Sequence, residues 1–403
     1  MKTYQIRIFP TKVQEQELLN LSQIRNDIWN TFADLQQQRI ESGLNILTNF
    51  DLHKLITTTK LTNNWGVLNS KASQRVATEL FKSYQSYFVL RKKDKTAKAP
   101  NKITNTNFHT LVYNQSGWVF KNNVVTINKI SFEYKTNIVD IEKKNIKEIR
   151  IKFKNDKWLV DIVIEEPKNF NSSITVQNKV LALDLGLKHL ATGVDTNGKV
   201  ITVPNRAKKI GRYFTNKIKT LKSKQSKCTK YSKRYTALNK VKSKLYSKKN
   251  AQIKQTLHIQ SKKLVNMNYK TIVVGDLQIK KLMQLDRNKK SKVSKSFGLS
   301  NIAMFIDMLT YKSVVLNQSV EKIDESNTTQ LNCLTGKLFD NKVTLSDREV
   351  QLSDTIIIDR DLNSAINILS RWQNKQLAPL IEPLDLSNVL NKFNLFIQES
   401  HSL

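Results

Sequence analysis

The sequence predicts an α+β protein of several domains, in which a small β-barrel interrupted by helices precedes a domain built on a second sheet. Three observations favour this fold class. Short runs with strand-like patterns occur at the N-terminus and again over residues 108–165. Apolar residues at helical spacing fill much of residues 14–90 between them. Beyond residue 177, apolar strand-like runs alternate with helical segments.

Residues 1–10 and 91–170 make up the predicted barrel, and residues 11–90 are helices inserted into it. The run 4–9 alternates polar and apolar residues and ends at Pro10, so we expect a strand that completes the barrel. Further strands are expected over 108–113, 117–120, 124–127, 130–134, 146–153 and 158–165. Helices are expected over about 14–42, 52–62 and 70–90. Off the apolar face of the third helix lie three side chains that could meet DNA: Gln74, Arg75 and Lys82.

The charge of the chain points to a polyanionic partner. Its 403 residues include 67 Lys and Arg against 33 Asp and Glu, a net charge of +34. Nucleic acid is the natural partner, because each neutralised phosphate releases counterions. Two cysteines, Cys228 and Cys333, provide neither a disulfide framework nor a zinc quartet, which fits a reducing cytoplasm. The sequence shows no signal-peptide core and no apolar run that could span a bilayer, so we expect no membrane partner.

The second sheet is expected to begin with the run 180–188, an apolar segment that contains one carboxylate, Asp184. A charge in such a run is costly unless a partner or a metal compensates it. We expect Asp184 in the middle of a strand, and a structural Asp at a strand end is the alternative. Asn197 and Gly198 then predict a hairpin. A strand over 271–277, a helix over 297–317, a strand over 320–323 and a helix from Asp359 follow.

A long basic segment interrupts this domain. No Asp or Glu occurs between residues 196 and 275, and residues 206–249 carry 17 Lys and Arg with tyrosines between them. Sparse apolar residues favour an exposed helical hairpin, along which an RNA duplex or a single strand could lie; a solvated coil is the alternative. The basic residues that we expect to bind nucleic acid are Lys208, Lys209, Arg212, Lys217, Lys222, Lys230, Lys233, Arg234 and, after the next strand, Lys280 and Lys281.

Strand with Asp, hairpin, helices, strand and helix with Asp is the order of an RNase H-like nuclease domain. Three runs resemble the RuvC motifs of TnpB proteins, transposon-encoded RNA-guided nucleases related to type V CRISPR effectors. They are Leu-Asp-Leu-Gly-Leu-Lys at 183–188, Ile-Val-Val-Gly-Asp-Leu at 272–277 and Asp-Arg-Asp-Leu-Asn-Ser-Ala-Ile-Asn at 359–367. The resemblance implies a wedge-like barrel, a helical recognition domain at 11–90 and a RuvC-like domain at 171–370. It also implies a zinc-ribbon region at 325–358, and it leaves residues 371–403 as a tail.

Two departures from the family pattern affect the expected chemistry. The catalytic Glu of the middle motif corresponds to Gly275, which leaves Asp184 and Asp361 as two of the three acids that hold metal ions in such sites. Asp276 points to the other face of its strand and cannot replace the missing acid. The four zinc-binding cysteines correspond to Asn332, Thr335, Gln351 and Asp354, so no tetrahedral thiolate site is available. We therefore expect no zinc and no required cofactor, although Asp184 and Asp361 could bind one Mg²⁺ weakly.

These losses predict a protein that is not an enzyme and that resembles the nuclease-dead TnpB-like repressors called TldR. It would bind a guide RNA from an adjacent locus resembling a transposon end. It would then find double-stranded DNA beside a short flanking motif and repress transcription in the bacterial cytoplasm, at the nucleoid. One alternative is an active nuclease whose third carboxylate has moved to Glu325 or Glu349. Another is an RNA-binding protein that does not target DNA. Gly275→Glu alone is expected to restore little cutting, because the ribbon region is altered too.

Overall fold

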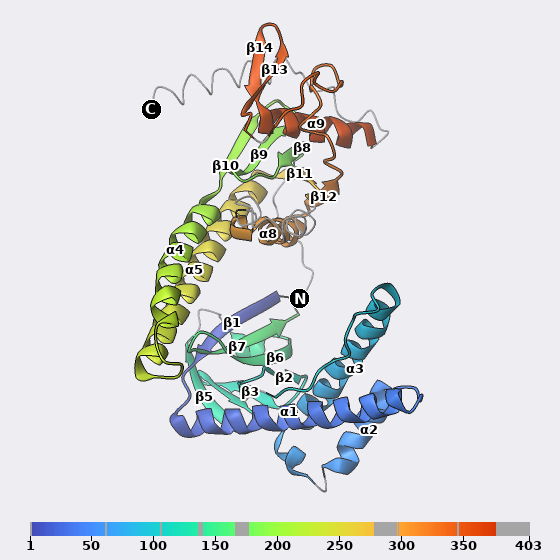
Figure 1. Cartoon of the computed structure of the whole chain (residues 1–403), viewed down its shortest axis with the longest axis vertical. Coiled ribbons are helices and arrows are strands. Elements are labelled where there is room, and N and C mark those ends of the chain that lie inside the picture. The colour runs from blue at the N-terminus through green and yellow to red at the C-terminus, as the bar shows by residue number, and fades with distance from the viewer. Residues whose placement is uncertain are drawn as a thin grey trace. The chain divides into compact units, whose positions relative to one another are not determined.

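The computed structural model describes residues 2–60, 63–104, 107–135, 140–165, 177–277, 296, 298–344 and 346–375. The chain divides into two compact units, Met1–Lys168 and Asn169–Leu403, each with its own hydrophobic core (Figure 1). Within the described ranges, no helix is both apolar and long enough to cross a membrane. The sequence predicts a linker over residues 167–177, and this segment, like the tail beyond residue 375, lies almost wholly outside the described residues.

The first unit contains a seven-stranded antiparallel sheet with the order β2-β6-β7-β1-β5-β4-β3. Strand β1 pairs with both β7 and β5, so the N-terminal strand joins the sheet as predicted. The sheet is nearly closed but is not the complete barrel that we expected, because β2 and β3 stand at the two ends of its order. The strands are β1 (Lys2–Ile8), β2 (Leu111–Asn114), β3 (Trp118–Lys121), β4 (Val124–Ile127), β5 (Ile130–Lys135), β6 (Ile146–Phe153) and β7 (Trp158–Ile164).

Three helices, α1 (Lys12–Glu41), α2 (Asn49–Thr59) and α3 (Ser70–Lys93), lie between β1 and β2 in the sequence, as predicted. A capping box between Thr11 and Gln14 starts α1 directly after Pro10. A second capping box, between Thr48 and Asp51, starts α2. The apolar faces of α1 and α3 join the core of the sheet, so the first unit has one continuous core.

The second unit contains a five-stranded mixed sheet with the order β10-β9-β8-β11-β12. Its strands are β8 (Gln177–Asp184), β9 (His189–Asp195), β10 (Val200–Pro204), β11 (Tyr269–Gly275) and β12 (Ser319–Ile323). Strands β8, β9 and β10 are antiparallel, whereas β11 runs parallel to both β8 and β12. The predicted hairpin between β9 and β10 is present, with Gly198 at φ 75° and the Asp195 carboxylate accepting from the backbone of Asn197 and Lys199.

Alternation along β8 and β11 gives this sheet two different buried faces. Leu181, Leu183, Ile272 and Val274 face the core that includes α5 (Lys233–Val265) and α8 (Ile302–Val315). The opposite face, with Val180, Ala182, Val273 and Ile323, packs against α9 (Arg360–Lys375). Side chains in register with this second set therefore point toward α9.

The basic segment forms the predicted helical hairpin, in which α4 (Arg206–Ser226) packs along α5 (Figure 1). A single stripe of α4 is buried, whereas the buried residues of α5 lie between Ile253 and Val265, near its C-terminal end. The N-terminal half of α5 and the turn between the helices consequently leave most of their basic side chains exposed. Farther along the chain, β13 (Glu349–Ser353) and β14 (Ile356–Asp359) form a two-stranded sheet directly before α9.

Candidate active site and nucleic-acid interface

The end of β8 and the start of α9 bring Asp184 and Asp361 together. Asp184 is the last residue of β8 and not in its middle, and it is in register with Ala182, which faces α9. Asp361 is buried in the first turn of α9. Its Oδ2 lies 3.9 Å from the position that a Cβ would occupy on Gly186, two residues after Asp184. The first and third sequence motifs therefore meet at one edge of the sheet.

The missing side chain at Gly275 leaves space that another acid occupies. Gly275 is the last residue of β11 and is in register with Val273, so a side chain there would point toward α9. A Cβ built on Gly275 would overlap Oε2 of Glu325 and lie 3.1 Å from the Cβ of that residue. Glu325, one of the two alternative acids that we considered, thus extends into the space beside Gly275, where the resemblance to TnpB proteins implies a catalytic glutamate.

The parallel pairing of β11 with β12 explains how Glu325 reaches this position. Gly275 lies opposite Ile323, and Glu325 follows Ile323 by two residues, so it continues the same face just beyond the strand end. Asp276 instead lies 3.6 Å from Lys322 and is 44% exposed. The direction that alternation predicts for Asp276 stays a prediction, because Asp276 also lies close enough to Glu325 to raise the pKa of that acid.

Burial and like charges raise the pKa values of Asp184 and Glu325. The pKa of Asp184 lies well above its usual value because of burial, reinforced by the negative charges of Asp361 and Glu325. Burial, with Asp276 and Asp324 nearby, raises the pKa of Glu325 to about 7. Its Oε2 is buried without a hydrogen-bond partner among the described residues. Asp184, Asp361 and Glu325, here called the acid cluster, are therefore only partly compensated.

Two basic residues offset part of the negative charge around the acid cluster. Arg360 forms an ion pair with Asp361 at 3.0 Å, and Lys188 lies 3.3 Å from Asp359. The other alternative acid, Glu349, is exposed in β13 opposite Asp359 and is not among the groups that raise the pKa of Asp184. Of the two candidates for the third carboxylate, the positions of the side chains therefore favour Glu325.

The donor set of the acid cluster fits a hard divalent cation. Carboxylate oxygens are the ligands that Mg²⁺ prefers, and the unpartnered Oε2 of Glu325 offers one. As they stand, the described side chains include no three His, Cys, Asp or Glu arranged to hold a metal ion. Asp184, Asp361 and Glu325 are the residues that would hold the ion.

Replacing Glu325 by Gln is expected to change how stability depends on pH. With its pKa near 7, Glu325 stays protonated in the folded state where the unfolded chain ionises it, so stability falls as pH rises from about 4.5 to 7. The full effect is on the order of 3 kcal/mol. In metal-free buffer, Glu325→Gln should reduce the fall in melting temperature between pH 5 and 8. Asp184 titrates in the same direction and should keep part of it; Glu349→Gln is the control. Parallel curves for wild type and Glu325→Gln would contradict the expectation.

The residues at the expected zinc positions make hydrogen bonds or lie in turns. Asn332 donates to the carbonyl of Leu352 at 2.9 Å and accepts from the backbone of Leu334 at 2.9 Å. Thr335 accepts from the backbone of Lys337 at 3.3 Å, while Gln351 belongs to β13 and Asp354 to the turn after it. Burial raises the pKa of the Cys333 thiol to about 12, which opposes the thiolate form that zinc requires. Absence of zinc stays a prediction.

Helix α9 also holds the segment that follows Glu325, a role that the sequence reasoning missed. Asn367 donates to the carbonyls of Thr328 at 2.9 Å and Leu331 at 2.8 Å. Asn363 donates to Leu331 at 2.7 Å and accepts from the backbone of Cys333 at 3.0 Å. The backbone of Thr328 in turn donates to the carbonyl of Glu325 at 3.1 Å. The helix that carries Asp361 therefore fixes the backbone next to Glu325.

Removing the Asn367 amide is expected to loosen this segment. Asn367→Ala leaves the carbonyl of buried Thr328 without this donor and leaves the Leu331 carbonyl with Asn363 alone, which should cost about 1–3 kcal/mol. Amide hydrogen exchange over residues 325–333 should accelerate, with a lower melting temperature. Asn374→Ala, at an exposed position of the same helix, is the matched control and should change neither. Unchanged exchange in Asn367→Ala would show that these hydrogen bonds do not hold the segment.

In the first unit, two of the three predicted DNA-facing side chains lie together. Gln74 and Arg75 line a hollow of about 190 Å³ with residues of α2, α3 and the end of β2. Arg75 is already paired with Glu79 at 3.0 Å and lies 3.8 Å from Glu148, which fixes the direction of its guanidinium. Lys82 is exposed on the same helix but does not line this hollow.

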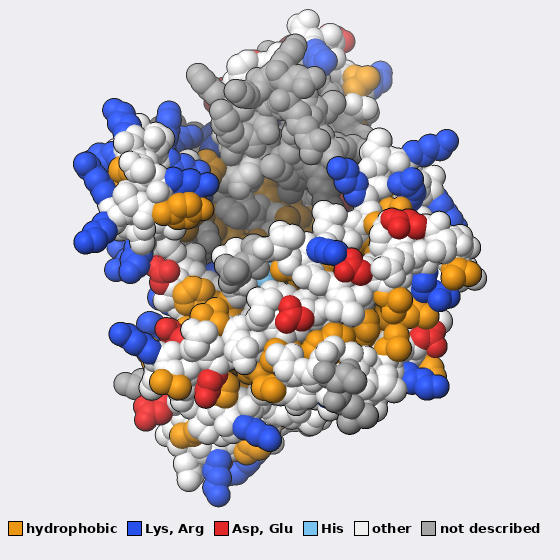
Figure 2. Space-filling model, turned by 60° about the horizontal axis from the view of Figure 1, so that its bottom comes forward, with side chains coloured by type: hydrophobic (Ala, Val, Ile, Leu, Met, Phe, Trp, Pro, Cys, Tyr) orange, Lys and Arg blue, Asp and Glu red, His pale blue; other side chains and the backbone are white. Residues whose placement is uncertain are grey.

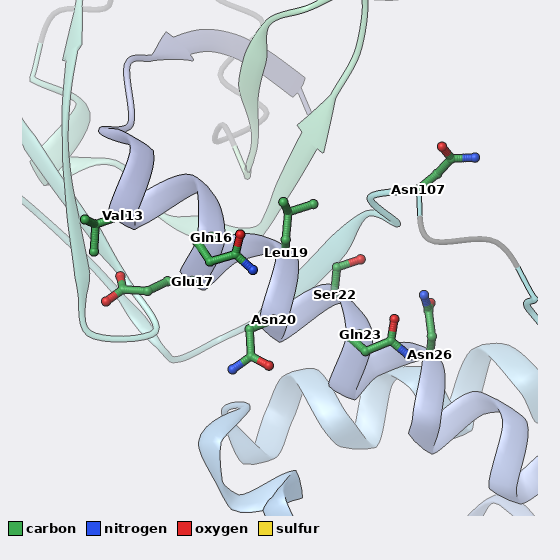
Figure 3. A pocket seen from close by; sticks show the side chains of 9 residues that line it. All are labelled: Val13, Gln16, Glu17, Leu19, Asn20, Ser22, Gln23, Asn26 and Asn107. Atoms are coloured by element: carbon green, nitrogen blue, oxygen red, sulfur yellow. The ribbon is translucent and has the colours of Figure 1, made fainter. Parts of the chain in front are cut away.

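A larger hollow, which the sequence did not indicate, runs along α1 and has a volume of about 590 Å³ (Figure 3). Its lining is rich in amides and includes one carboxylate and no basic residue, so it differs from a phosphate-binding site. The lining residues are Val13, Gln16, Glu17, Leu19, Asn20, Ser22, Gln23, Asn26 and Asn107.

In the second unit, most of the predicted basic residues lie on the exposed surface of the α4–α5 hairpin. Figure 2 shows a dense group of Lys and Arg side chains at the upper left, the side on which Figure 1 places this hairpin. Lys208 differs, because its ammonium donates to the carbonyl of Leu187 at 2.9 Å, in the connection that follows Asp184. Lys280 and Lys281 lie outside the described residues. The exposed ones are Lys209, Arg212, Lys217, Lys222, Lys230, Lys233 and Arg234.

Carboxylates clustered at a sheet edge beside a long basic hairpin are features of proteins that act on nucleic acids. Residues 162–286, which include Asp184 and Gly275, match the family OrfB_IS605, described as probable transposase. Residues 303–368, which include Glu325 and Asp361, match the family described as Cas12f1-like, TNB domain. No curated protein sequence matches the chain.

One of the solved structures that match this chain shows a similar fold. The chain is similar to the protein in the Cas12f1–sgRNA–target DNA complex, with a TM-score of 0.58, 13% identity, and coverage of 89% of this chain and 83% of that one. It also matches C2c1 of Alicyclobacillus acidoterrestris bound to single-guide RNA, with a TM-score of 0.39, 8% identity, and coverage of 88% and 69%. The Cas12f1 structure thus shares the fold of this chain, and the two family matches cover parts of the second unit.

Proposed function

We propose that this chain is an RNA-guided DNA endonuclease in which Glu325 has taken the place of the third catalytic acid. The observation that carries the proposal is the Glu325 side chain, which fills the space beside Gly275 and raises the pKa of Asp184. The fold shared with a Cas12f1–sgRNA–target DNA complex and the family matches support the same function class.

The residues of the acid cluster would take part in hydrolysis by binding divalent cations. Divalent cations, when bound, would activate the attacking water and stabilise the leaving oxygen of the phosphodiester. Asp184, Asp361 and Glu325 would bind them through carboxylate oxygens supplied by three separate elements. Arg360 orients Asp361 through its ion pair, and both side chains are nearly buried. Lys188 and Lys208 lie at the same end of the sheet, where a DNA phosphate would approach.

Sequence recognition would come from base pairing and from a short flanking motif. The basic surface of the α4–α5 hairpin is suited to hold RNA and the hybrid through their phosphates. The hollow lined by Gln74 and Arg75 is suited to read base edges, because amide and guanidinium groups make paired hydrogen bonds with them. The chain itself would then need to read only a few base pairs.

Purification of the chain with its bound RNA tests this function. RNA that copurifies should be sequenced, and DNA matching its 3′ or 5′ segment should be offered with varied flanking sequences. Cleavage that needs a matched target and Mg²⁺, and that stops when the metal is chelated, is the expected result. Target binding without any cleavage under these conditions would refute the nuclease.

A second candidate is the nuclease-dead, TldR-like repressor, which the glycine at residue 275 and the altered zinc positions favour. In that case the guide from a neighbouring transposon-end-like locus would direct the protein to DNA, where it would block transcription. Binding of matched DNA with no cut product would identify it. RNA that copurifies without any guide-dependent DNA footprint would instead identify an RNA-binding protein that does not target DNA.

A further inference from the structure

The turn between α4 and α5 holds a tyrosine in an unfavourable backbone conformation. Tyr231 has φ 68° and is 79% exposed. At such φ values the Cβ of an L-residue crowds the backbone, and glycine is the usual choice at the matching position of a turn. An exposed bulky side chain gains little from packing, so packing does not account for a tyrosine here. Residues kept in strained conformations are found mainly at functional sites.

Hydrogen bonds on both sides hold this turn in place. The backbone of Ser232 donates to the carbonyl of Thr229 at 3.1 Å, and the Ser232 hydroxyl caps α5 by accepting from Tyr235 at 3.2 Å. Buried Gln225 donates to the carbonyl of Tyr235 at 3.4 Å and accepts from Lys242 at 2.6 Å. The aromatic ring is therefore presented on a fixed support, although it is itself exposed.

The surroundings of Tyr231 identify the chemistry of a partner. The ring centre lies 6.3 Å from that of Tyr235 and 5.2 Å from the Lys230 ammonium. Lys233 and Arg234 are exposed nearby, and no acid occurs between residues 196 and 275. An open aromatic face amid cations fits a nucleobase with its flanking phosphates, since bases stack on aromatic rings with little dependence on sequence. Bases inside a duplex are already stacked on both faces, so the fit is to an unpaired base.

We propose that Tyr231 stacks on an unpaired base of the RNA that the chain binds. This assignment rests on the RNA binding of the proposed function and adds a specific contact at the tip of the α4–α5 hairpin. It does not involve the acid cluster, so loss of the contact should weaken RNA binding without altering the residues that would cut DNA.

Tyr231→Gly removes the aromatic ring but keeps the backbone conformation of the turn, because glycine adopts the observed φ without strain. The variant of the full chain should unfold at the same or a higher temperature than wild type. Its affinity for the RNA that copurifies with wild type, sequenced and transcribed in vitro, should fall on the order of ten- to a hundredfold. The slope of affinity against salt should stay unchanged, because no charge is lost. Tyr231→Trp should restore the affinity.

Controls separate the failure of this contact from failure of the proposed function. Tyr311→Ala, an exposed tyrosine on α8, should leave RNA affinity unchanged. A fully paired duplex of the same strand should bind wild type and Tyr231→Gly almost equally. Two outcomes would refute the contact while the proposed function stands, provided that wild type binds RNA. In the first, Tyr231→Gly binds the RNA as tightly as wild type does. In the second, the variant loses as much affinity for the duplex as for the unpaired RNA. An equal loss for single-stranded DNA of that sequence also refutes the assignment to RNA. If wild-type protein purifies without bound RNA, the proposed function itself is refuted.

Discussion

Glu325→Gln is expected to lower Mg²⁺-dependent cleavage of guide-matched DNA on the order of a thousandfold or more. The substitution removes one charge from the acid cluster while keeping the size of the side chain, and metal-held charges contribute several kcal/mol to such transition states. Asp184→Asn should have an equally large effect. Binding of guide RNA and target DNA should persist in both variants, because neither residue belongs to the basic surface. Cleavage of a labelled matched duplex, with binding measured in parallel, provides the readout.

Glu349→Gln is the matched control for this experiment. Glu349 was the second candidate for a moved acid, but its side chain is exposed in β13. Cleavage by this variant should equal that of wild type. A wild type that cuts, combined with full activity in Glu325→Gln, would show that the third acid lies elsewhere.

Returning the acid to residue 275 is expected to impair the chain unless Glu325 is removed as well. A side chain on Gly275 would overlap the Glu325 carboxylate, so Gly275→Glu should displace that acid and lower cleavage roughly ten- to a hundredfold, because a misplaced catalytic group costs about this much in rate. The double variant Gly275→Glu with Glu325→Gly rebuilds the family arrangement. Its cleavage should recover to within roughly tenfold of wild type, which would be a strong non-additivity between the two sites.

Cleavage rates of wild type, Gly275→Glu, Glu325→Gly and the double variant, measured with one guide and one target, show whether residues 275 and 325 share one position. Gly275→Ala should also lower cleavage, since even a methyl group meets the Glu325 carboxylate. Additive losses in the double variant would mean that residues 275 and 325 do not share one position. Gain of cutting in Gly275→Glu alone would support the inactive-nuclease prediction for the natural chain.

Local patterns were sufficient to predict much of the fold. Alternation in the N-terminal run placed a strand that does join the first sheet, and Asn197 with Gly198 placed the β9–β10 hairpin. These features depend on residues close together in the sequence, where periodicity and turn preferences act directly.

Features that depend on distant residues were not predicted with the same success. The choice of Glu325 over Glu349 depends on the register of β11 with β12, strands more than 40 residues apart. That register could have been proposed by aligning the strand-like runs 271–275 and 319–323, which places residue 325 just beyond residue 275. Closure of the first sheet, the Asn363 and Asn367 contacts and the φ of Tyr231 depend on tertiary packing, and no local pattern indicates them.

Helix α9 sets the positions of two acids of the acid cluster, Asp361 and Glu325. Asp361 lies in the first turn of this helix, and about two turns later Asn367 donates a hydrogen bond to the backbone carbonyl of Thr328, just after Glu325. Asp184, by contrast, sits on the central strand of the sheet. The position of this one helix on the sheet therefore sets the distance of both Asp361 and the Glu325 segment from Asp184.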